Sequence, residues 1–317
     1  MYRHSRVAAV FGCMATLAMV GCATNAGVEP LTGSSMQQSQ STVPTGPDWI
    51  YQNGVLFHKP HFMATRRMAA GHRVNSNLLL TYGGGPVLVK AKIYLIFWGY
   101  KTYGDADKVK PLLKDYIKHM GGSGHNDIYT QYYETLNAKT VDIKNPKREL
   151  AGIWEDDTDA VPTNPSQAQV AAEAGVGVTH FGFDPNGEYV VATPHGRSTP
   201  GFGTSFCAYH DDAFSGNNIF SFTNLPYMPD AGSNCGSNIT TAPKDESSVD
   251  EGVTIVEGHE EGESVTDPQP FSGWNSQQGE IGDICAWIDI ENDPFGKESY
   301  TMQPMYSNAT ESCVHSL

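Results

Sequence analysis

Several common catalytic and binding signatures are missing from this 317-residue sequence. It contains no glycine-rich phosphate loop, no internal repeat and no Gly-x-Ser-x-Gly segment, so Ser/His/Asp catalysis has no local support. Basic residues are few, because 20 lysines and arginines stand against 35 aspartates and glutamates. This acidic balance argues against nucleic acid as a partner, since surfaces that bind nucleic acid are normally basic.

Long apolar runs are also missing after residue 22, so no later segment is predicted to span a bilayer. Residues 1–22 have the layout of an export signal, with Arg3 and Arg6 before the apolar run Val7–Val20. Met19-Val20-Gly21-Cys22 resembles a bacterial lipobox. We therefore predict an exported cell-envelope lipoprotein whose only link to the membrane is a lipid at Cys22. A secreted or periplasmic protein, cleaved near Ala23, is the alternative.

No two cysteines have C-x-x-C spacing, which argues against a cysteine metal site. Cys13 and Cys22 lie in the signal region. The cysteines that remain are Cys207, Cys235, Cys285 and Cys313. An even number in an oxidising compartment predicts two disulfides, for which three pairings are possible. Near neighbours close the shorter loops, and this favours Cys207–Cys235 and Cys285–Cys313.

The rest of the chain divides by composition into three parts. Residues 23–48 are rich in Ser, Thr, Gln, Gly and Pro, which predicts a disordered tether. Residues 49–77 include His58, His61 and His72 and are interpreted as an N-terminal arm, mobile or propeptide-like, with a His-rich metal tract as the alternative. Residues 78–317 are predicted to form a single catalytic-type domain.

Hydrophobic patterns within that domain predict a mixed α+β (α/β) fold. The expectation is a loop-rich structure in which helices flank a central mixed sheet and one zincin-like helix carries a metal site. Expected strands are Val87–Trp98, buried on both faces at Ile93–Trp98, Glu149–Trp154 and Phe220–Tyr227, with a strand-turn-strand over Val176–Pro194. Expected helices are Asp105–Met120, Asp127–Leu136, Ser166–Gly175 with Ser166 as N-cap, and Ser247–Thr266.

The last of these helices contains His259-Glu260-x-x-Glu263, a His-Glu-x-x-His motif whose second histidine is replaced by glutamate. His259 and Glu263 are four residues apart, so on a helix they project from one face and can bind one metal ion. Glu280 is the expected third ligand. Asp283, one turn further on, is expected to orient His259 from behind or to replace Glu280 as ligand.

A solvated acidic helix face is the simpler interpretation of this motif. Apolar residues precede it at helical spacing, however, so Glu260 and Glu263 continue a buried stripe, and buried carboxylates are costly unless they are paired or bind a metal. Gly258 and Gly262 are poor helix formers. They predict either close packing over the site or an irregular helix.

The chemistry of the motif predicts metal-dependent hydrolysis. Glu260 is the expected general base for a water polarised by the metal, and Tyr209 or His210 would steady the oxyanion. Zn²⁺ is the expected metal, while the carboxylate-rich donors leave Mn²⁺ or Ca²⁺ open. A peptide or protein substrate could pair with the strand Glu188–Thr193.

Several segments together resemble the phosphate-induced/EXORDIUM-like family, over roughly Leu78 to Trp287. They are Tyr82-Gly-Gly-Gly-Pro86-Val87, Ile93-Tyr-Leu-Ile-Phe-Trp98-Gly99, Phe206-Cys-Ala-Tyr-His210, the motif with Thr266-Asp267-Pro268, Gly273-Trp274 and Glu280-Ile-Gly-Asp-Ile-Cys285. The resemblance to bacterial and fungal relatives with a His-Glu-x-x-Glu helix implies a zincin-like metallopeptidase. Plant members lack the tetrad and are extracellular growth-related proteins, so the resemblance alone does not imply catalysis.

Three functions therefore stay open at the level of sequence. The first is an exported metal-dependent peptidase, in which zinc is the expected ion. The second is a non-catalytic cell-surface protein that binds carbohydrate or Ca²⁺ and uses the acidic cluster structurally. The third is a metal-dependent glycosidase with Glu260 and Asp283 as its carboxylate pair, which an aromatic-rich cleft would support but the sequence does not provide.

Overall fold

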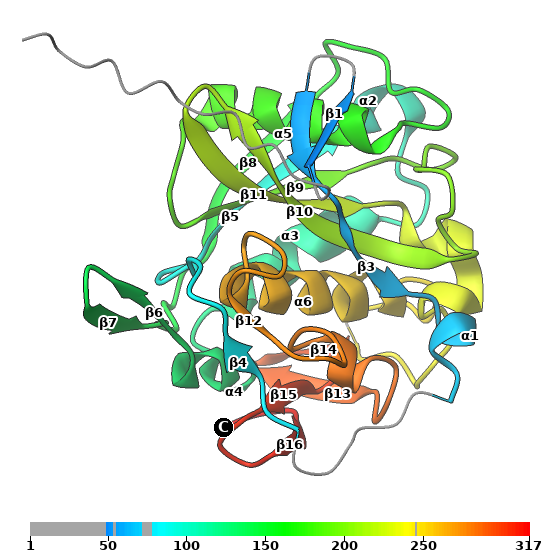
Figure 1. Ribbon diagram of the computed structural model, residues 1–317. Coiled ribbons are helices and arrows are strands. Elements are labelled where there is room, and N and C mark those ends of the chain that lie inside the picture. The colour runs from blue at the N-terminus through cyan, green and yellow to red at the C-terminus, as the bar shows by residue number, and fades with distance from the viewer. Residues whose placement is uncertain (1–48, 53–54, 72–77, 245) are drawn as a thin grey trace, which may run out of the picture. The chain divides into compact units, whose positions relative to one another are not determined.

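The computed structural model describes residues 49–52, 55–71, 78–244 and 246–317 (Figure 1). The chain divides into two units, residues 1–42 and 43–317, and the description concerns the second. The predicted signal, lipobox and tether lie outside the described residues, as does His72.

The described unit is built on an eight-stranded mixed sheet in the order β1-β2-β10-β11-β9-β5-β8, with β3 also paired to β10 (Figure 1). The parallel strands β5, β8, β9 and β11 adjoin the antiparallel strand β10. The predicted mixed α+β fold is therefore confirmed. The strands are β1 (Trp49–Gln52), β2 (Val55–His58), β3 (His61–Ala64), β5 (Lys92–Trp98), β8 (Leu150–Asp156), β9 (Gly187–Ala192), β10 (Phe206–Ser215) and β11 (Asn218–Leu225).

The parallel strands β5, β9 and β11 lie inside the sheet, whereas β8 forms its edge. In β5, Ile93, Leu95 and Phe97 enter the core on one face, and Ile96 and Trp98 enter the core on the other. This confirms the continuous apolar run as a central strand. By contrast, the expectation that residues 188–193 pair with a substrate is wrong. β9 already bonds to β5 on one edge and to β11 on the other, so it has no free edge.

Helices cover both faces of the sheet (Figure 1). α5 (Gln167–Phe181) packs on one face, and α3 (Val109–Met120) and α6 (Glu251–Thr266) pack on the other. α5 begins as predicted, because the Ser166 side chain accepts from the Gln169 backbone while the Gln169 side chain accepts from the Ser166 backbone.

Smaller elements enclose α6 on the side away from the sheet (Figure 1). The hairpin β13-β14 contacts α6 directly, and β15 packs against η1 and η3. The remaining elements of the described chain are β13 (Glu291–Phe295), β14 (Glu298–Met302), β15 (Met305–Ser307), β16 (Ser312–Val314), β4 (Thr81–Tyr82), β12 (Trp274–Asn275), β6 (Tyr133–Leu136), β7 (Lys139–Asp142), α1 (Arg66–Ala69), α2 (Tyr100–Tyr103), α4 (Gly124–Asp127), η1 (Ile128–Gln131), η2 (Met228–Cys235) and η3 (Asp283–Cys285). Across the described ranges, no helix combines the length and apolar character needed to cross a membrane.

Three local expectations are corrected by the structure. Residues 49–64 do not form a separate arm, because β1, β2 and β3 join the main sheet through β10. The expected helix over residues 127–136 is one short turn, η1, followed by the hairpin strand β6. The first expected strand of residues 176–194 is the end of α5, which runs on to Phe181 because its small residues pack closely on the sheet.

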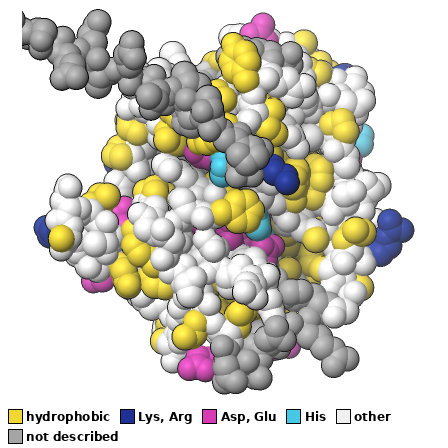
Figure 2. Space-filling model, in the orientation of Figure 1, with side chains coloured by type: hydrophobic (Ala, Val, Ile, Leu, Met, Phe, Trp, Pro, Cys, Tyr) yellow, Lys and Arg dark blue, Asp and Glu magenta, His cyan; other side chains and the backbone are white. Residues whose placement is uncertain are grey.

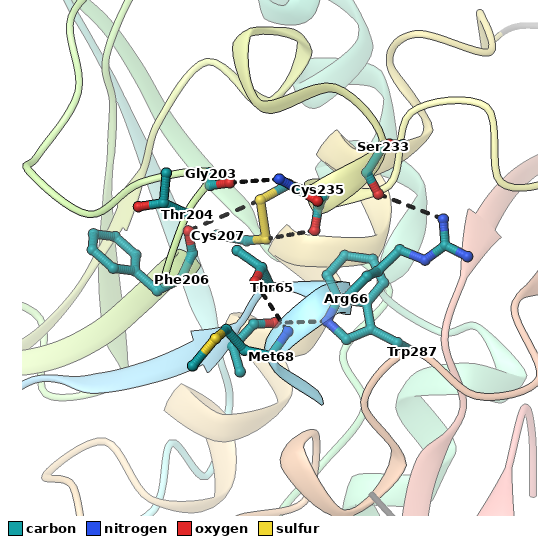
Figure 3. Close-up of a disulfide and its surroundings, with 12 residues drawn as sticks. Thr65, Arg66, Met68, Gly203, Thr204, Phe206, Cys207, Ser233, Cys235 and Trp287 are labelled. Carbon is teal, nitrogen blue, oxygen red and sulfur yellow. Dashed lines mark hydrogen bonds between the residues drawn. A yellow bond between two sulfur atoms is a disulfide. The ribbon is translucent and has the colours of Figure 1, made fainter. Parts of the chain in front are cut away.

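Both predicted disulfides are present, Cys207–Cys235 and Cys285–Cys313, and each joins residues 28 apart. The first links β10 to the end of η2 (Figure 3). Around it, Asn234 donates from its side chain to the backbone oxygen of Gly203. The disulfide and this hydrogen bond together fix the end of η2 against the start of β10, where Cys207 is three residues from His210.

A buried carboxyl group on α5 predicts a pH-dependent stability. Burial, and then the nearby carboxylate of Asp156, raise the pKa of Glu173 to about 8. Above its ordinary pKa the unfolded chain has lost this proton while the folded chain keeps it, so the free energy of unfolding falls as pH rises towards 8. One such group changes that free energy by at most about 1.4 kcal/mol per pH unit.

We therefore expect Glu173→Gln, which mimics the protonated side chain at every pH, to gain stability relative to wild type between pH 5 and pH 8. Urea unfolding of both proteins at several pH values measures the difference, and the wild type serves as the control for all other titrating groups. A difference that stays constant over this range would contradict the assignment.

Candidate metal centre

Helix α6 carries the His-Glu-x-x-Glu motif through the interior, and all of its residues are buried. Its two glycines permit this. A Cβ on Gly258 would lie 2.4 Å from the Met302 Cε, and one on Gly262 would lie 3.0 Å from the Tyr129 hydroxyl. Close packing, one of the two expected explanations, is therefore the reason for these poor helix formers.

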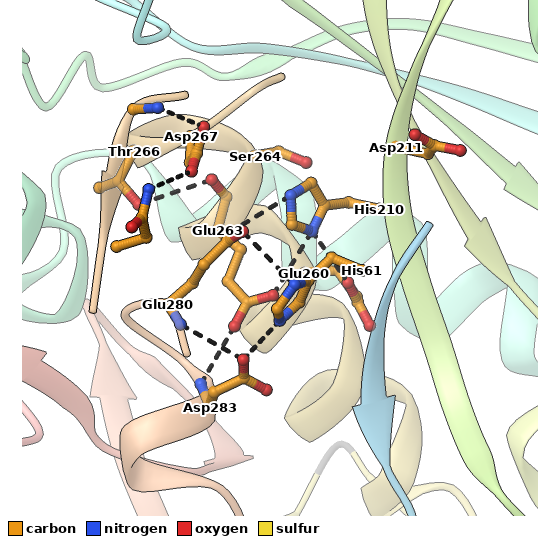
Figure 4. A network of polar contacts seen from close by, with 12 residues as sticks. His61, His210, Asp211, Glu260, Glu263, Ser264, Thr266, Asp267, Glu280 and Asp283 are labelled. Atoms are coloured by element: carbon orange, nitrogen blue, oxygen red, sulfur yellow. Dashed lines mark hydrogen bonds and ion pairs between the residues drawn. The ribbon is translucent and has the colours of Figure 1, made fainter. Parts of the chain in front are cut away.

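The carboxylate of Glu263 lies at the centre of a cluster of polar side chains (Figure 4). Its Oε1 is 3.1 Å from Nε2 of His259. The same Oε1 accepts a hydrogen bond of 3.0 Å from the backbone N–H of Asp283. Its Oε2 lies 3.4 Å from Nδ1 of His210. His259 and Glu263 thus project from one face of the helix, as their spacing predicts.

His210 enters the cluster from β10, above α6 (Figure 4). Its Nδ1 is 3.5 Å from Glu260 Oε2, and its Nε2 is 3.4 Å from Glu280 Oε2. All three side chains are fully buried. Neither ring nitrogen of His210 has a hydrogen-bond partner among the described residues, and the same holds for the carboxyl oxygens of Glu260 and Glu280.

His61 completes the cluster from β3. Its Nε2 is 2.5 Å from Asp283 Oδ2, and its Nδ1 is 3.6 Å from Glu280 Oε1. β3 runs antiparallel to β10 with His61 directly opposite His210. Side chains at such a paired position lie on the same face of a sheet, so the strand pairing itself brings the two rings together.

The ion pairs in the cluster shift its pKa values in opposite directions. Burial lowers the pKa of His61, but Asp283 outweighs this effect, with help from Glu263, and raises it to about 9. His259 behaves in the same way, because Glu263 and Asp283 raise its pKa against burial. Burial raises the pKa of Glu263, but His259 and His210 hold it well below its ordinary value.

For the fully buried residues Glu260, Glu280 and His210, no ion pair outweighs the effect of burial on the pKa. Burial, followed by the neighbouring carboxylates, raises the pKa values of Glu260 and Glu280 well above the ordinary range. Burial also lowers the pKa of His210, despite Glu263. Buried polar groups are normally hydrogen-bonded or bound to a metal. The uncompensated histidine and carboxyls are therefore donor groups that fit a bound cation.

The structure brings together six of the seven residues proposed from the sequence: His210, His259, Glu260, Glu263, Glu280 and Asp283. Tyr209 is the exception. Adjacent residues of a strand point to opposite faces, and its ring packs between Phe62 and Phe222 on the face of β10 away from His210.

The expected role of Asp283 also changes. Its Oδ1 lies 3.7 Å from Nε2 of His259, on the side where Glu263 also stands. The other ring nitrogen, Nδ1, faces Gly282, where an added Cβ would lie only 2.7 Å away. Asp283 thus stands beside the expected ligand atom of His259 and does not orient the ring from behind.

His61 is the site residue that the sequence interpretation placed elsewhere. It belongs to a short segment separated from the motif by about two hundred residues, and only its pairing with β10 brings it close. The sequence feature that pointed to His61 was the concentration of histidines in residues 58–72, which we interpreted alternatively as a metal-binding tract. That segment supplies one histidine to the cluster.

Two further groups of metal-binding side chains occur in the described residues. His58, Asp211 and Asp212 lie on β2 and β10, and Glu291, Asp293 and His315 lie near the C-terminus. The second group is partly exposed, and His315 donates to the Asp293 carboxylate at 2.9 Å. Neither group contains a residue of the His-Glu-x-x-Glu motif.

Among the described residues of the cluster, His61 and Asp283 are the ones that solvent reaches. The side chains of His61 and Asp283 are 12% and 18% exposed, whereas the inner members are fully buried. Figure 2 shows histidine and acidic side chains meeting at the surface on this face, beside hydrophobic ones.

A pocket of about 400 Å³ adjoins Asp283 and is lined by Ala64, Met68, Ala69, Gln278 and Ala286. Phe271, with a positive φ of 70°, packs edge-on against His61 at this opening.

Comparison of the chain with protein-family models, with curated proteins and with solved structures finds no match.

Proposed function

We propose that this chain is a metal-dependent hydrolase that cleaves peptide bonds, the function implied by its resemblance to the His-Glu-x-x-Glu relatives of the EXORDIUM-like family. The observation that carries the proposal is the buried cluster of histidines and carboxylates around Glu263, in which His210 and Glu280 lack hydrogen-bond partners among the described residues. Their mutual contacts of 3.4–3.5 Å are ion pairs without hydrogen-bond geometry, so these buried atoms remain available as metal donors.

The residues at the cluster fit a divalent ion. His259, Glu263 and Glu280 would hold it, with His210, His61 and Asp283 within reach. Such an ion supplies a Lewis acid that polarises a carbonyl oxygen and acidifies water. Histidine nitrogens suit Zn²⁺, and the many carboxylate oxygens also suit Mn²⁺.

Glu260 would move the proton in this reaction. Its carboxyl is fully buried beside His210 and has no hydrogen-bond partner in the described chain. Burial and the neighbouring carboxylates raise its pKa well above that of an ordinary glutamate, which makes its carboxylate a stronger proton acceptor. It would take a proton from the attacking water and give it to the leaving amine nitrogen.

The opening of the site favours an extended chain as substrate. β3 pairs with β10 and with no other described strand, so no strand covers its edge beside His61, although the backbone oxygen of Ala64 at its end accepts a hydrogen bond from Trp287. A peptide can add to such an edge through main-chain hydrogen bonds, and an adjoining pocket can then accept a side chain. The pocket that Ala64 of β3 shares with Asp283 lies at the required place. The predicted lipid at Cys22 would hold this activity in the cell envelope.

A chelation experiment tests the proposal. We expect purified protein to cleave a mixed peptide pool, to lose this activity after dialysis against a chelator, and to regain it with Zn²⁺ or Mn²⁺. Mass spectrometry of the new peptide termini identifies the bonds cleaved. His195→Ala, which changes an exposed histidine paired with Asp230, serves as the control and should behave like wild type.

Two results would contradict the proposal. One is a protein that contains a transition metal but cleaves no peptide in the pool. The other is a protein that retains Ca²⁺ only and shows no hydrolysis. The second result would favour the non-catalytic alternative, a surface protein that binds Ca²⁺ or carbohydrate.

A further inference from the structure

The metal-binding side chains of the cluster form two groups. One group comprises His61, Glu263 and Asp283, and the other comprises His210, Glu263 and Glu280. Within each group the donor atoms lie within 4.8 Å of one another. Glu263 is the only residue that the two groups share. The cluster is therefore wider than the donor set of one ion.

The two oxygens of Glu263 face different groups. Oε1 points to the outer side, where it lies 3.1 Å from His259 Nε2 and accepts from the Asp283 backbone. Oε2 points to the inner side, 3.4 Å from His210 Nδ1. A carboxylate placed in this way can give one oxygen to each of two ions. Pairs of ions about 3.5–4 Å apart are common in hydrolytic enzymes.

The number of donors also exceeds the needs of a single ion. A catalytic zinc takes three protein ligands and keeps one position open. Here three histidines (His61, His210 and His259) and three carboxylates (Glu263, Glu280 and Asp283) contact one another, and Glu260 beside His210 remains available as the base. His210 is the decisive member, because it is fully buried, points into the inner group and has no hydrogen-bond partner among the described residues.

We propose that the centre binds two divalent metal ions bridged by Glu263. His61, Asp283 and His259 belong to the outer ion, which faces the opening, and His210 and Glu280 belong to the inner ion. The inference rests on the metal-binding part of the proposed function. It adds a second ion and two histidine ligands, and it divides His259 and Glu280 between the two ions. The outer position lies beside the pocket and is the one that a substrate would meet first.

Counting bound ions tests this proposal without any activity measurement. Protein freed of metal by a chelator is loaded with Mn²⁺ or Zn²⁺ alone, and the bound ions are counted by elemental analysis and native mass spectrometry. We expect two ions per chain in the wild type. His61→Ala and His210→Ala should each bind one ion, and Glu263→Ala should weaken both sites at least tenfold. His195→Ala is the control and should bind two.

Electron paramagnetic resonance of the wild type loaded with two Mn²⁺ should show the exchange coupling of a bridged pair. This measurement needs no variant, so it decides the matter even if a substitution prevents folding. Saturation at one ion per chain, or two uncoupled ions, would overturn the proposal. Two coupled ions without peptide cleavage would refute the peptidase function alone, whereas one ion with cleavage would refute the bridged pair alone.

Discussion

Replacement of Glu260 by glutamine is expected to lower kcat for peptide hydrolysis by about 10²–10⁴-fold, the usual contribution of a general acid–base group. The substitution keeps the shape of the side chain and removes only its ability to accept a proton. Because Glu260 is fully buried without a hydrogen-bond partner among the described residues, the amide should be accommodated. Metal content should stay the same as in the wild type, since the bridging carboxylate and the histidines are unchanged.

The neighbouring residue offers a matched control. Glu261 lies on the same helix and is equally buried, but it faces Asn126, whose side-chain amide donates to it at 3.4 Å. Burial and the carboxylates of Glu149 and Glu188 raise its pKa well above the ordinary value. Glu261→Gln should therefore retain activity. A Glu260→Gln protein with full, metal-dependent hydrolysis would show that another group moves the proton.

Site residues that are close together in the sequence could be predicted from it. His259, Glu260 and Glu263 lie within one helical turn, and their relative placement follows from helix geometry alone. The disulfides followed in the same way from loop length. The continuous apolar run of Ile93–Trp98 identified a central strand, because only a strand covered on both faces tolerates it.

Contacts that depend on strand pairing could not be predicted. His61 meets His210 only because β3 lies against β10, and no feature of a four-residue strand specifies a partner so far along the chain. The direction of Tyr209 was missed for a related reason. Tyr209 and His210 were expected in the same role, whereas a strand sends the two side chains to opposite faces.

The start of α6 was also missed, and burial is the reason. The helix was expected from Ser247, but α6 starts at Glu251, and the apolar residue Val249 before it is 41% exposed. Since every residue of α6 is buried, the helix has no solvent-facing side and its sequence shows no clear period. Gly252 indicates the packing of the N-terminal end of α6 better than the apolar pattern does, because it allows close approach to the backbone of Cys235.

Substitution of Gly252 by alanine is expected to destabilise the protein by about 3 kcal/mol or more. A Cβ at this position would lie 1.9 Å from the backbone oxygen of Cys235, and that loop cannot withdraw freely because the Cys207–Cys235 disulfide holds it to β10. The clash is with backbone, so a change of side-chain rotamer cannot relieve it. Chemical denaturation of wild type and variant measures the loss.

The control is another helical glycine in open surroundings. An added Cβ on Gly175 of α5 would find its nearest neighbour, an atom of Phe220, at 3.9 Å, so Gly175→Ala should stabilise the protein by about 0.5–1 kcal/mol through helix propensity alone. Equal effects at the two positions would contradict the packing argument. Relief of the clash in Gly252→Ala would displace α6, which should also carry His259 and Glu263 away from His210. We therefore expect Gly252→Ala to weaken metal binding under conditions where the protein remains folded, and Gly175→Ala to leave it unchanged.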